Sequence, residues 1–168
     1  MEGLSYGMPL VLLAAALALH VPFAPSTATL KGQAGETLTV VIPPKFHIGP
    51  MQPLVLTLEA EHTQITISWT ANDVDASVQK ALDRNVQKAK KEGRFVGNVK
   101  VGPYSGGAFR YQVPKSAQSI SYHASLVSRA NHLSISYVDI AGSFMSPAKA
   151  KALFLDILKT AKIRPAGK

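Results

Sequence analysis

The chain has 168 residues, a hydrophobic fraction of 46% and a formal net charge of +8. This length suits one domain with short extensions, and this composition excludes an intrinsically disordered chain. The chain has no cysteine, which excludes disulfides, thiolate nucleophiles and cysteine metal clusters. All eighteen Lys and Arg lie from Lys31 onward, against nine acids, so this part alone carries +9. Such a charge favours an anionic lipid, a nucleic acid or an acidic protein as partner, or serves solubility alone.

The N-terminal segment resembles a secretory signal. Residues 3–30 carry no charge, Leu10 to Leu19 is an unbroken apolar run, and Ser26-Thr27-Ala28 supplies the small residues that signal peptidase recognises. We therefore predict a signal peptide over residues 1–28, a linker over 29–36, and export to the periplasm or the cell exterior. The usual basic start is missing, so the alternative is an uncleaved anchor, although the run is shorter than the roughly 20 residues of a membrane span. No cysteine follows the run, which excludes a lipoprotein.

Alternating apolar residues predict the first strands. One strand covers residues 37–42, and the proline-rich segment 43–53 is an irregular connection because proline cannot donate to a strand ladder. Residues 54–59 and 65–69 alternate again on either side of a polar bend. They predict a β-hairpin.

A basic amphipathic helix follows. Thr70 or Asn72 is its expected N-cap, Asp73 and Asp75 suit its first turn, and Gly93 ends it. Its apolar stripe is formed by Val74, Val78, Ala81, Leu82, Val86 and Ala89. We expect this stripe to lie on the sheet, with the basic side outward.

A second β-hairpin, over residues 119–139, is the predicted centre of the sheet. Folding the chain at Arg129 and Ala130 gives it two faces. The expected apolar pairs are Leu126 with Leu133, Ala124 with Ile135, and Tyr122 with Tyr137. The polar face carries Ser121, His123, Ser125, Ser134 and Ser136.

Three further segments complete the prediction. Residues 99–102 form a short edge strand, 103–107 a turn, and 108–113 a strand with Phe109, Tyr111 and Val113 facing inward. Ser146 caps a final helix that Pro147 begins and Arg164-Pro165 ends, leaving a basic tail over 164–168. The apolar stripe of this helix is Ala150, Leu153, Phe154, Ile157, Leu158 and Ala161.

This order of elements resembles the PsbP-like family, the superfamily of PsbP and Mog. The resemblance covers residues 37–163 and includes the Gly-Gly-Ala-Phe-Arg-Tyr strand at 106–111, the tyrosines Tyr122 and Tyr137, and the last helix. It implies an α+β fold in which helices pack on both faces of an antiparallel sheet, an α-β-α sandwich of β2-α-β3-α order. It also implies a non-catalytic binding or assembly role, often outside the cytoplasm. Family members differ in their partners, so the resemblance assigns no functional residue, and segment 43–53 has no counterpart in it.

The histidines, serines and acids are the candidates for catalysis or metal binding. No two of the five histidines have metal-ligand spacing on a helix, and we expect His123 and His132 to be exposed strand residues. Ser105 does not match Gly-x-Ser-x-Gly. Glu59 and Glu61 could bind a cation or act in acid–base chemistry, but such pairs are usually solvated edges. We predict no catalytic, cofactor-binding or metal-binding residue.

The best candidate for an interaction is the basic side of the first helix, where we predict partner-binding residues. They are Lys80, Arg84, Lys88, Lys91 and Arg94. A merely solvated helix face is the alternative. We expect a protein or an anionic membrane as partner, and no nucleic acid because no aromatic residue lies among these cations. The sequence thus predicts an exported, non-catalytic accessory protein of a membrane-associated or envelope assembly. The alternatives are a small exported hydrolase, tested by Ser105→Ala, and an N-terminally anchored protein of the membrane surface.

Overall fold

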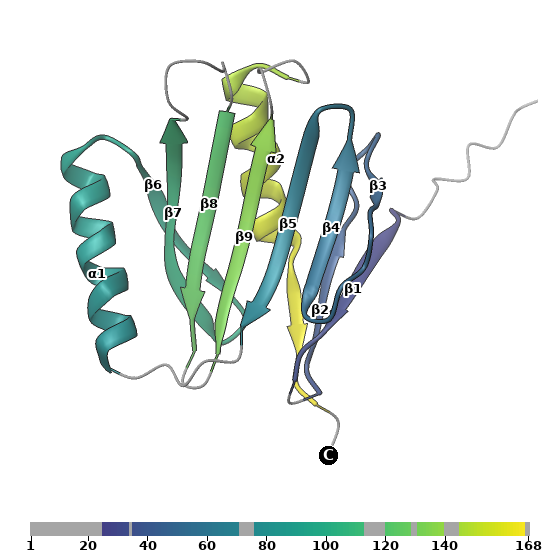
Figure 1. Cartoon of the computed structure of the whole chain (residues 1–168), viewed down its shortest axis with the longest axis horizontal. Coiled ribbons are helices and arrows are strands. Elements are labelled where there is room, and N and C mark those ends of the chain that lie inside the picture. Colours follow the sequence, from purple (N-terminus) through teal and green to yellow (C-terminus); the bar gives the residue numbers. More distant parts are fainter. Residues whose placement is uncertain are drawn as a thin grey trace, which may run out of the picture.

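The computed structural model describes residues 25–33, 35–70, 76–112, 120–128, 131–139 and 145–166. Within these ranges the chain forms ten strands and two helices (Figure 1). The strands are β1 (Thr27–Lys31), β2 (Thr37–Val41), β3 (His47–Ile48), β4 (Val55–Ala60), β5 (Thr63–Thr70), β6 (Phe95–Val101), β7 (Tyr104–Gln112), β8 (Ile120–Val127), β9 (His132–Asp139) and β10 (Lys162–Arg164). The helices are α1 (Ala76–Lys91) and α2 (Pro147–Thr160).

The strands build two antiparallel sheets. The larger sheet has the order β3-β4-β5-β9-β8-β7-β6, and the smaller one has the order β1-β2-β10. The predicted register of the β8–β9 hairpin is confirmed, with Leu126 opposite Leu133 and Tyr122 opposite Tyr137. The hairpin lies at the centre of the larger sheet, as expected.

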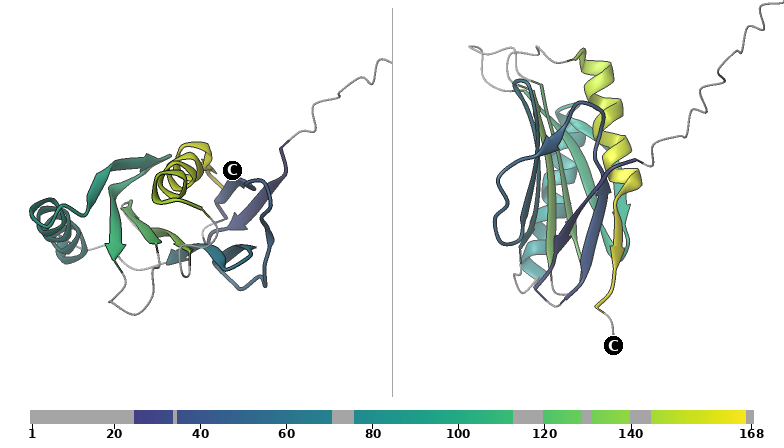
Figure 2. Two further views of the ribbon diagram at one scale, coloured as in Figure 1. Left: turned by 90° about the horizontal axis from the view of Figure 1, so that it is seen from above. Right: turned by 90° about the vertical axis from the view of Figure 1, so that its right-hand side faces the viewer.

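The predicted α-β-α sandwich is wrong. The described residues are mostly β-strand, and a second sheet takes the place that a layer of helices would occupy. The larger sheet curls around α2, and the smaller sheet closes the remaining side (Figure 2). The other helix, α1, lies outside this curl and contacts only β6 and β7 extensively. The concave face is therefore covered by α2 together with the smaller sheet, and the convex face by α1.

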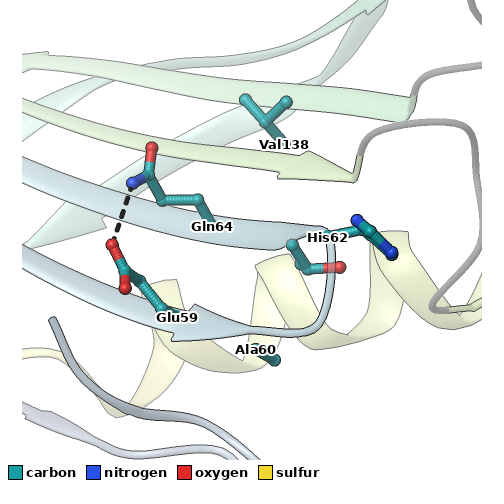
Figure 3. A pocket seen from close by; sticks show the side chains of 6 residues that line it. Glu59, Ala60, His62, Gln64 and Val138 are labelled. Carbon is teal, nitrogen blue, oxygen red and sulfur yellow. Dashed lines mark hydrogen bonds between the residues drawn. The ribbon is translucent and has the colours of Figure 1, made fainter.

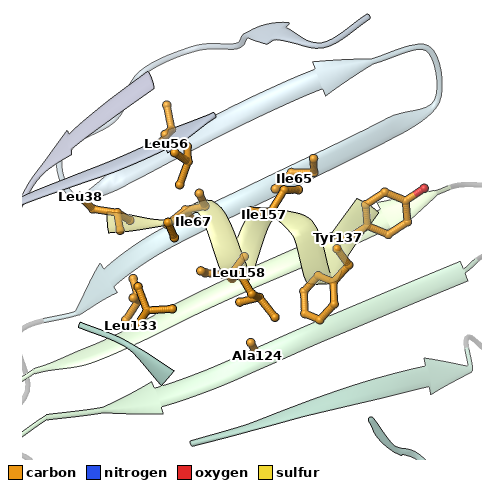
Figure 4. Close-up of a cluster of buried hydrophobic side chains, with 14 of the residues drawn as sticks. Leu38, Leu56, Ile65, Ile67, Ala124, Leu133, Tyr137, Ile157 and Leu158 are labelled. Carbon is orange, nitrogen blue, oxygen red and sulfur yellow. The ribbon is translucent and has the colours of Figure 1, made fainter. Parts of the chain in front are cut away.

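The main core lies between the concave face of the larger sheet, α2 and the smaller sheet (Figure 4). Leu38 of β2 reaches this core, beside Ile157 and Leu158 of α2. Trp69 and Tyr104 add a buried polar contact, because the indole nitrogen donates to the phenol oxygen at 2.7 Å. The strands alternate buried and partly exposed residues, as a sheet with only one fully covered face requires.

A smaller core cluster holds α1 to the convex face of the larger sheet. It contains Leu82 and Ala89 of α1, together with Phe109 and Val127. Phe109 therefore points away from the main core, and Tyr111, which was expected to face inward, is exposed. Gly93 ends α1 as predicted: it has a φ of 65° and donates to Lys90, while Arg94 donates to Ala89. Thr70, one of the two predicted N-caps, lies in β5, whereas Asn72, Asp73 and Asp75 lie outside the described residues.

Three short strands, β1, β3 and β10, were not predicted, and β3 lies in the segment 43–53 that was expected to be irregular. β1 pairs with β2, and the cleavage predicted after Ala28 falls inside it. β10 occupies residues that the sequence assigned to the end of the last helix and to the tail. The helix ends at Thr160, where Ala161 takes an extended conformation with ψ of 126°. Ser146 is the N-cap residue, but its side chain makes no capping hydrogen bond.

The predicted turn at 103–107 is also wrong, because β7 already begins at Tyr104. Gly106 pairs with Leu126 of β8, and a Cβ at Gly106 would lie 1.9 Å from the main-chain oxygen of Ser125. Only glycine fits this close approach between strands. Gly106 and Gly107 therefore belong to a strand, although a turn was predicted there.

We expect Gly106→Ala to lower the free energy of unfolding by about 3 kcal/mol, because β7 and β8 must move apart to admit the methyl group. Gly97→Ala in β6 is the matched control, since a Cβ there would meet no atom within 4 Å. We expect the control to change stability by less than about 1 kcal/mol. Urea unfolding of both variants measures the difference, and equal stabilities would show that β7 and β8 approach less closely.

Candidate functional site

The basic face of α1 is the outer side of a helix that stands at one end of the larger sheet (Figure 1). Lys80, Arg84, Lys88 and Lys91 are all exposed there. At about 100° per residue they lie within one quarter of the helix circumference, opposite buried Leu82 and Ala89. Each inner residue of α1 packs on the sheet, so the cations are left on the side that faces solvent.

Arg94, the fifth predicted partner-binding residue, is directed elsewhere. It lies beyond Gly93, its Nε donates to the Glu92 carboxylate at 2.7 Å, and its guanidinium carbon lies 5.4 Å from the centre of the Tyr111 ring. Lys88 also approaches Glu92, at 4.0 Å. Glu92 therefore partly neutralises this end of the helix. The structure brings four of the five predicted residues together and ties Arg94 to the sheet.

The convex face of the larger sheet carries two histidine–serine contacts between β8 and β9. His123 Nδ1 lies 2.8 Å from Ser136 Oγ, directly across the hairpin. His132 Nε2 lies 2.7 Å from Ser125 Oγ, along a diagonal of the same face. Both imidazoles are partly buried, so the expectation that they are exposed is wrong.

Burial lowers the pKa of both histidines below the ordinary value. For His123 burial is the larger cause, and the nearby His132 adds to it through repulsion of like charges. For His132 burial alone is the cause. Burial therefore favours the neutral form of both rings, in which each can accept or donate a hydrogen bond without adding charge.

A hollow of about 180 Å³ opens where α1 passes over this face; we call it the α1 hollow. It is lined by Val78, Ala81, Leu82 and Asn85 of α1 and by Ser125, Val127 and His132 of the hairpin. Four of these side chains are apolar and three are neutral and polar. This site could not be predicted from the sequence, because the helix and the hairpin meet only in the tertiary fold.

A second hollow, of about 280 Å³, lies at the turn between β4 and β5 (Figure 3). Glu59 points into it and accepts a hydrogen bond from Gln64 at 3.4 Å. Glu59 also lies 3.9 Å from His47, whereas Glu61 is exposed and lies 4.0 Å from His62. The two glutamates therefore have different neighbours. Within the described ranges, no three His, Asp or Glu side chains lie close enough together to hold a metal ion.

The histidine–serine contacts differ from a hydrolytic site. A serine nucleophile needs a base that a third group orients, and free N–H donors for an oxyanion. Ser125 and His132 lie within paired strands, where main-chain N–H groups serve the ladders. Ser105 lies in β7, opposite Val127, and not at a strand-to-helix elbow.

Comparison with known proteins gives a fold but no family. The chain matches no protein-family model and no curated protein sequence. The crystal structure of LpqN, a protein involved in cell envelope biogenesis of Mycobacterium tuberculosis, is similar with a TM-score of 0.55 at 13% identity. The match covers 83% of this chain and 91% of LpqN. At that identity the likeness shows the fold alone, and the resemblance to the PsbP-like family stays a prediction. Neither helix of the described ranges has the length and apolar character needed to cross a membrane.

We expect acid to destabilise the protein partly through His123 and His132. Below about pH 6.5 the unfolded chain binds more protons than the folded one, because folding lowers both pKa values. This contribution to stability is therefore complete above pH 6.5 and is lost as the pH falls. Urea unfolding between about pH 7.5 and pH 5 measures it. The double variant His123→Gln, His132→Gln should lose less stability over this range, and an equal loss would contradict the assignment.

Proposed function

We propose that this chain is an exported, non-catalytic binding or accessory protein of a membrane-associated or envelope assembly. The observation that carries the proposal is the basic face of α1. Four exposed cations lie on one side of a helix whose opposite side anchors it to the sheet. Such a face attracts acidic surfaces and raises the rate of encounter with them.

The likeness to LpqN supports the envelope part of this proposal. LpqN is involved in cell envelope biogenesis, and its fold matches most of this chain. The apolar N-terminal run, followed by small residues, supports export independently. The fold provides a rigid β-scaffold and the helix provides the charge. We therefore assign the protein to contact with an anionic partner, either a protein or a membrane surface.

The position of α1 bears on the anchored alternative. The described chain begins near β1, and α1 lies at the opposite end of the molecule (Figure 1). Seven strands at about 4.8 Å give the larger sheet a width of about 29 Å along its curve. A membrane held beside β1 would thus be far from the basic face. This arrangement favours a partner other than an anchoring membrane.

Cleavage of the N-terminal segment separates export from anchoring. We expect N-terminal sequencing of the exported protein to begin at Thr29. That product keeps Thr29, Leu30 and Lys31 of β1 paired with β2, although it loses the Ser26 oxygen that accepts from the Ile42 nitrogen. A first residue of Met1 or Met8 would instead support the anchored alternative.

The basic face is tested by reversing its charge. We expect the triple variant Lys80→Glu, Arg84→Glu, Lys88→Glu to weaken binding at least about a hundredfold, since each surface cation contributes about 1 kcal/mol. Binding is measured by pull-down from the native envelope and by sedimentation with vesicles of anionic and of neutral lipid. The two assays distinguish a protein partner from a membrane.

The matched control reverses three exposed lysines of the other helix, Lys149, Lys151 and Lys159. It changes the net charge equally but leaves α1 intact. We expect the control to bind nearly as the wild type does, and wild-type binding to weaken with salt. Salt-insensitive binding, or an equal loss in both variants, would reject the basic face as the site.

A further inference from the structure

We propose that the α1 hollow and the basic face together bind an acidic segment of a partner protein, with one apolar side chain of that segment in the hollow. This inference rests on the proposed function and gives the chemistry of the partner. The segment must carry negative charge for the basic face and an apolar side chain that fits the hollow on the neighbouring side of the helix.

The hollow and two of the cations lie on the same flank of α1. Ala81 lines the hollow, and Arg84 and Lys88 follow it by three and seven residues. Residues three apart are neighbours on a helix surface, and a residue seven positions further lies on the same side two turns away, about 10 Å along the axis. One short segment can therefore place an acid on Arg84 or Lys88 while a nearby side chain enters the hollow.

The lining of the hollow selects an uncharged side chain. Val78, Ala81, Leu82 and Val127 supply apolar contact, and no lining residue is a carboxylate, a lysine or an arginine. His132 adds no charge at neutral pH, because burial lowers its pKa. A volume of about 180 Å³ would hold about six water molecules, which is the scale of one aliphatic side chain.

The rim of the hollow suits the main chain of an extended segment. Asn85 is exposed and offers both an amide donor and a carbonyl acceptor. Ser125 and His132 are held in place by their 2.7 Å contact. A segment that leaves its apolar side chain in the hollow can bond its N–H and C=O groups to these side chains. Preorganised polar groups of this kind reduce the entropy lost on binding.

The geometry favours a protein segment over a bilayer. Successive residues of a helix are turned by about 100°, so the lining residues Asn85 and Val78 point about 100° to 120° away from the middle, or crest, of the basic face. A flat surface that touches the crest cannot also reach the hollow on the flank. A flexible acidic segment can follow both surfaces.

The test uses two labelled seven-residue peptides, each with six glutamates and a central leucine or glycine. Fluorescence anisotropy measures their affinity for the whole protein. We expect the leucine peptide to bind about tenfold more tightly, and both peptides to bind more weakly as salt rises. Ala81→Trp fills the hollow and should abolish the preference for leucine. Gln87→Trp, at an exposed position on the other flank of α1, is the matched control and should keep it.

A second measurement does not depend on a variant that folds. In NMR spectra of the wild-type protein, the leucine peptide should shift the imidazole resonances of His132, and the glycine peptide should leave them nearly unchanged. Resonance shifts at His62, near the β4–β5 turn, without shifts at His132 would overturn the inference.

The outcomes separate this inference from the proposed function. Equal, salt-dependent binding of both peptides would overturn the role of the hollow while the basic face stands. No binding of either peptide would also overturn the inference, whereas the proposed function is decided by the envelope pull-down and its charge-reversed variants. A leucine preference that survives Ala81→Trp would place the apolar contact elsewhere and would reject the hollow.

Discussion

The register of the β8–β9 hairpin is the constraint on which both surfaces of the protein depend. It places Tyr122 and Tyr137 on the concave side, where α2 covers them, and His123 and Ser136 on the convex side. A slip of one residue would exchange the two sides, because strand side chains alternate. It would put imidazoles into an apolar core and aromatic rings into water. The buried tyrosines thus hold the histidines in place, and stability and the proposed binding surface share one cause.

Curvature of the larger sheet explains why the two helices differ so much. The concave side must be filled, so α2 is enclosed and contributes Phe154, Ile157 and Leu158 to the main core. The convex side receives only α1, which is attached through a small cluster around Leu82 and Phe109. A helix held by one narrow stripe leaves most of its circumference to solvent. Charged side chains on this exposed part of the helix carry no desolvation cost. The narrow attachment also leaves the α1 hollow between the helix and the sheet.

Long periodic segments could be predicted from the sequence, and short or tertiary features could not. The alternation of apolar and polar residues along the eight residues of β8 and of β9 predicted their pairing correctly. The spacing of the cations along α1 predicted correctly that four of them cluster. β10 has only three residues, too few for a period of two to stand out from the helix before it. Gly106 was taken for a turn residue because its need for glycine comes from Ser125 of another strand. The His132–Ser125 contact could have been predicted, since a diagonal pair follows from the register. The α1 hollow could not be predicted, because it depends on how a helix crosses a hairpin.

Charge and shape have different effects on binding in the proposed site. His132 lines the hollow in a form that carries little charge, so the two effects arise from different residues. Exposed cations act over roughly a Debye length and mainly raise the rate of encounter, with little choice among acidic surfaces. A small apolar hollow acts only on contact, and it slows the departure of a segment that fits. If His132 were charged at pH 7, the hollow would attract acids and repeat the function of Arg84 and Lys88. Burial lowers the pKa of His132 and so further favours the neutral ring, which leaves the hollow to discriminate by the shape and polarity of a side chain. Selectivity therefore comes from the sheet, and attraction comes from the helix.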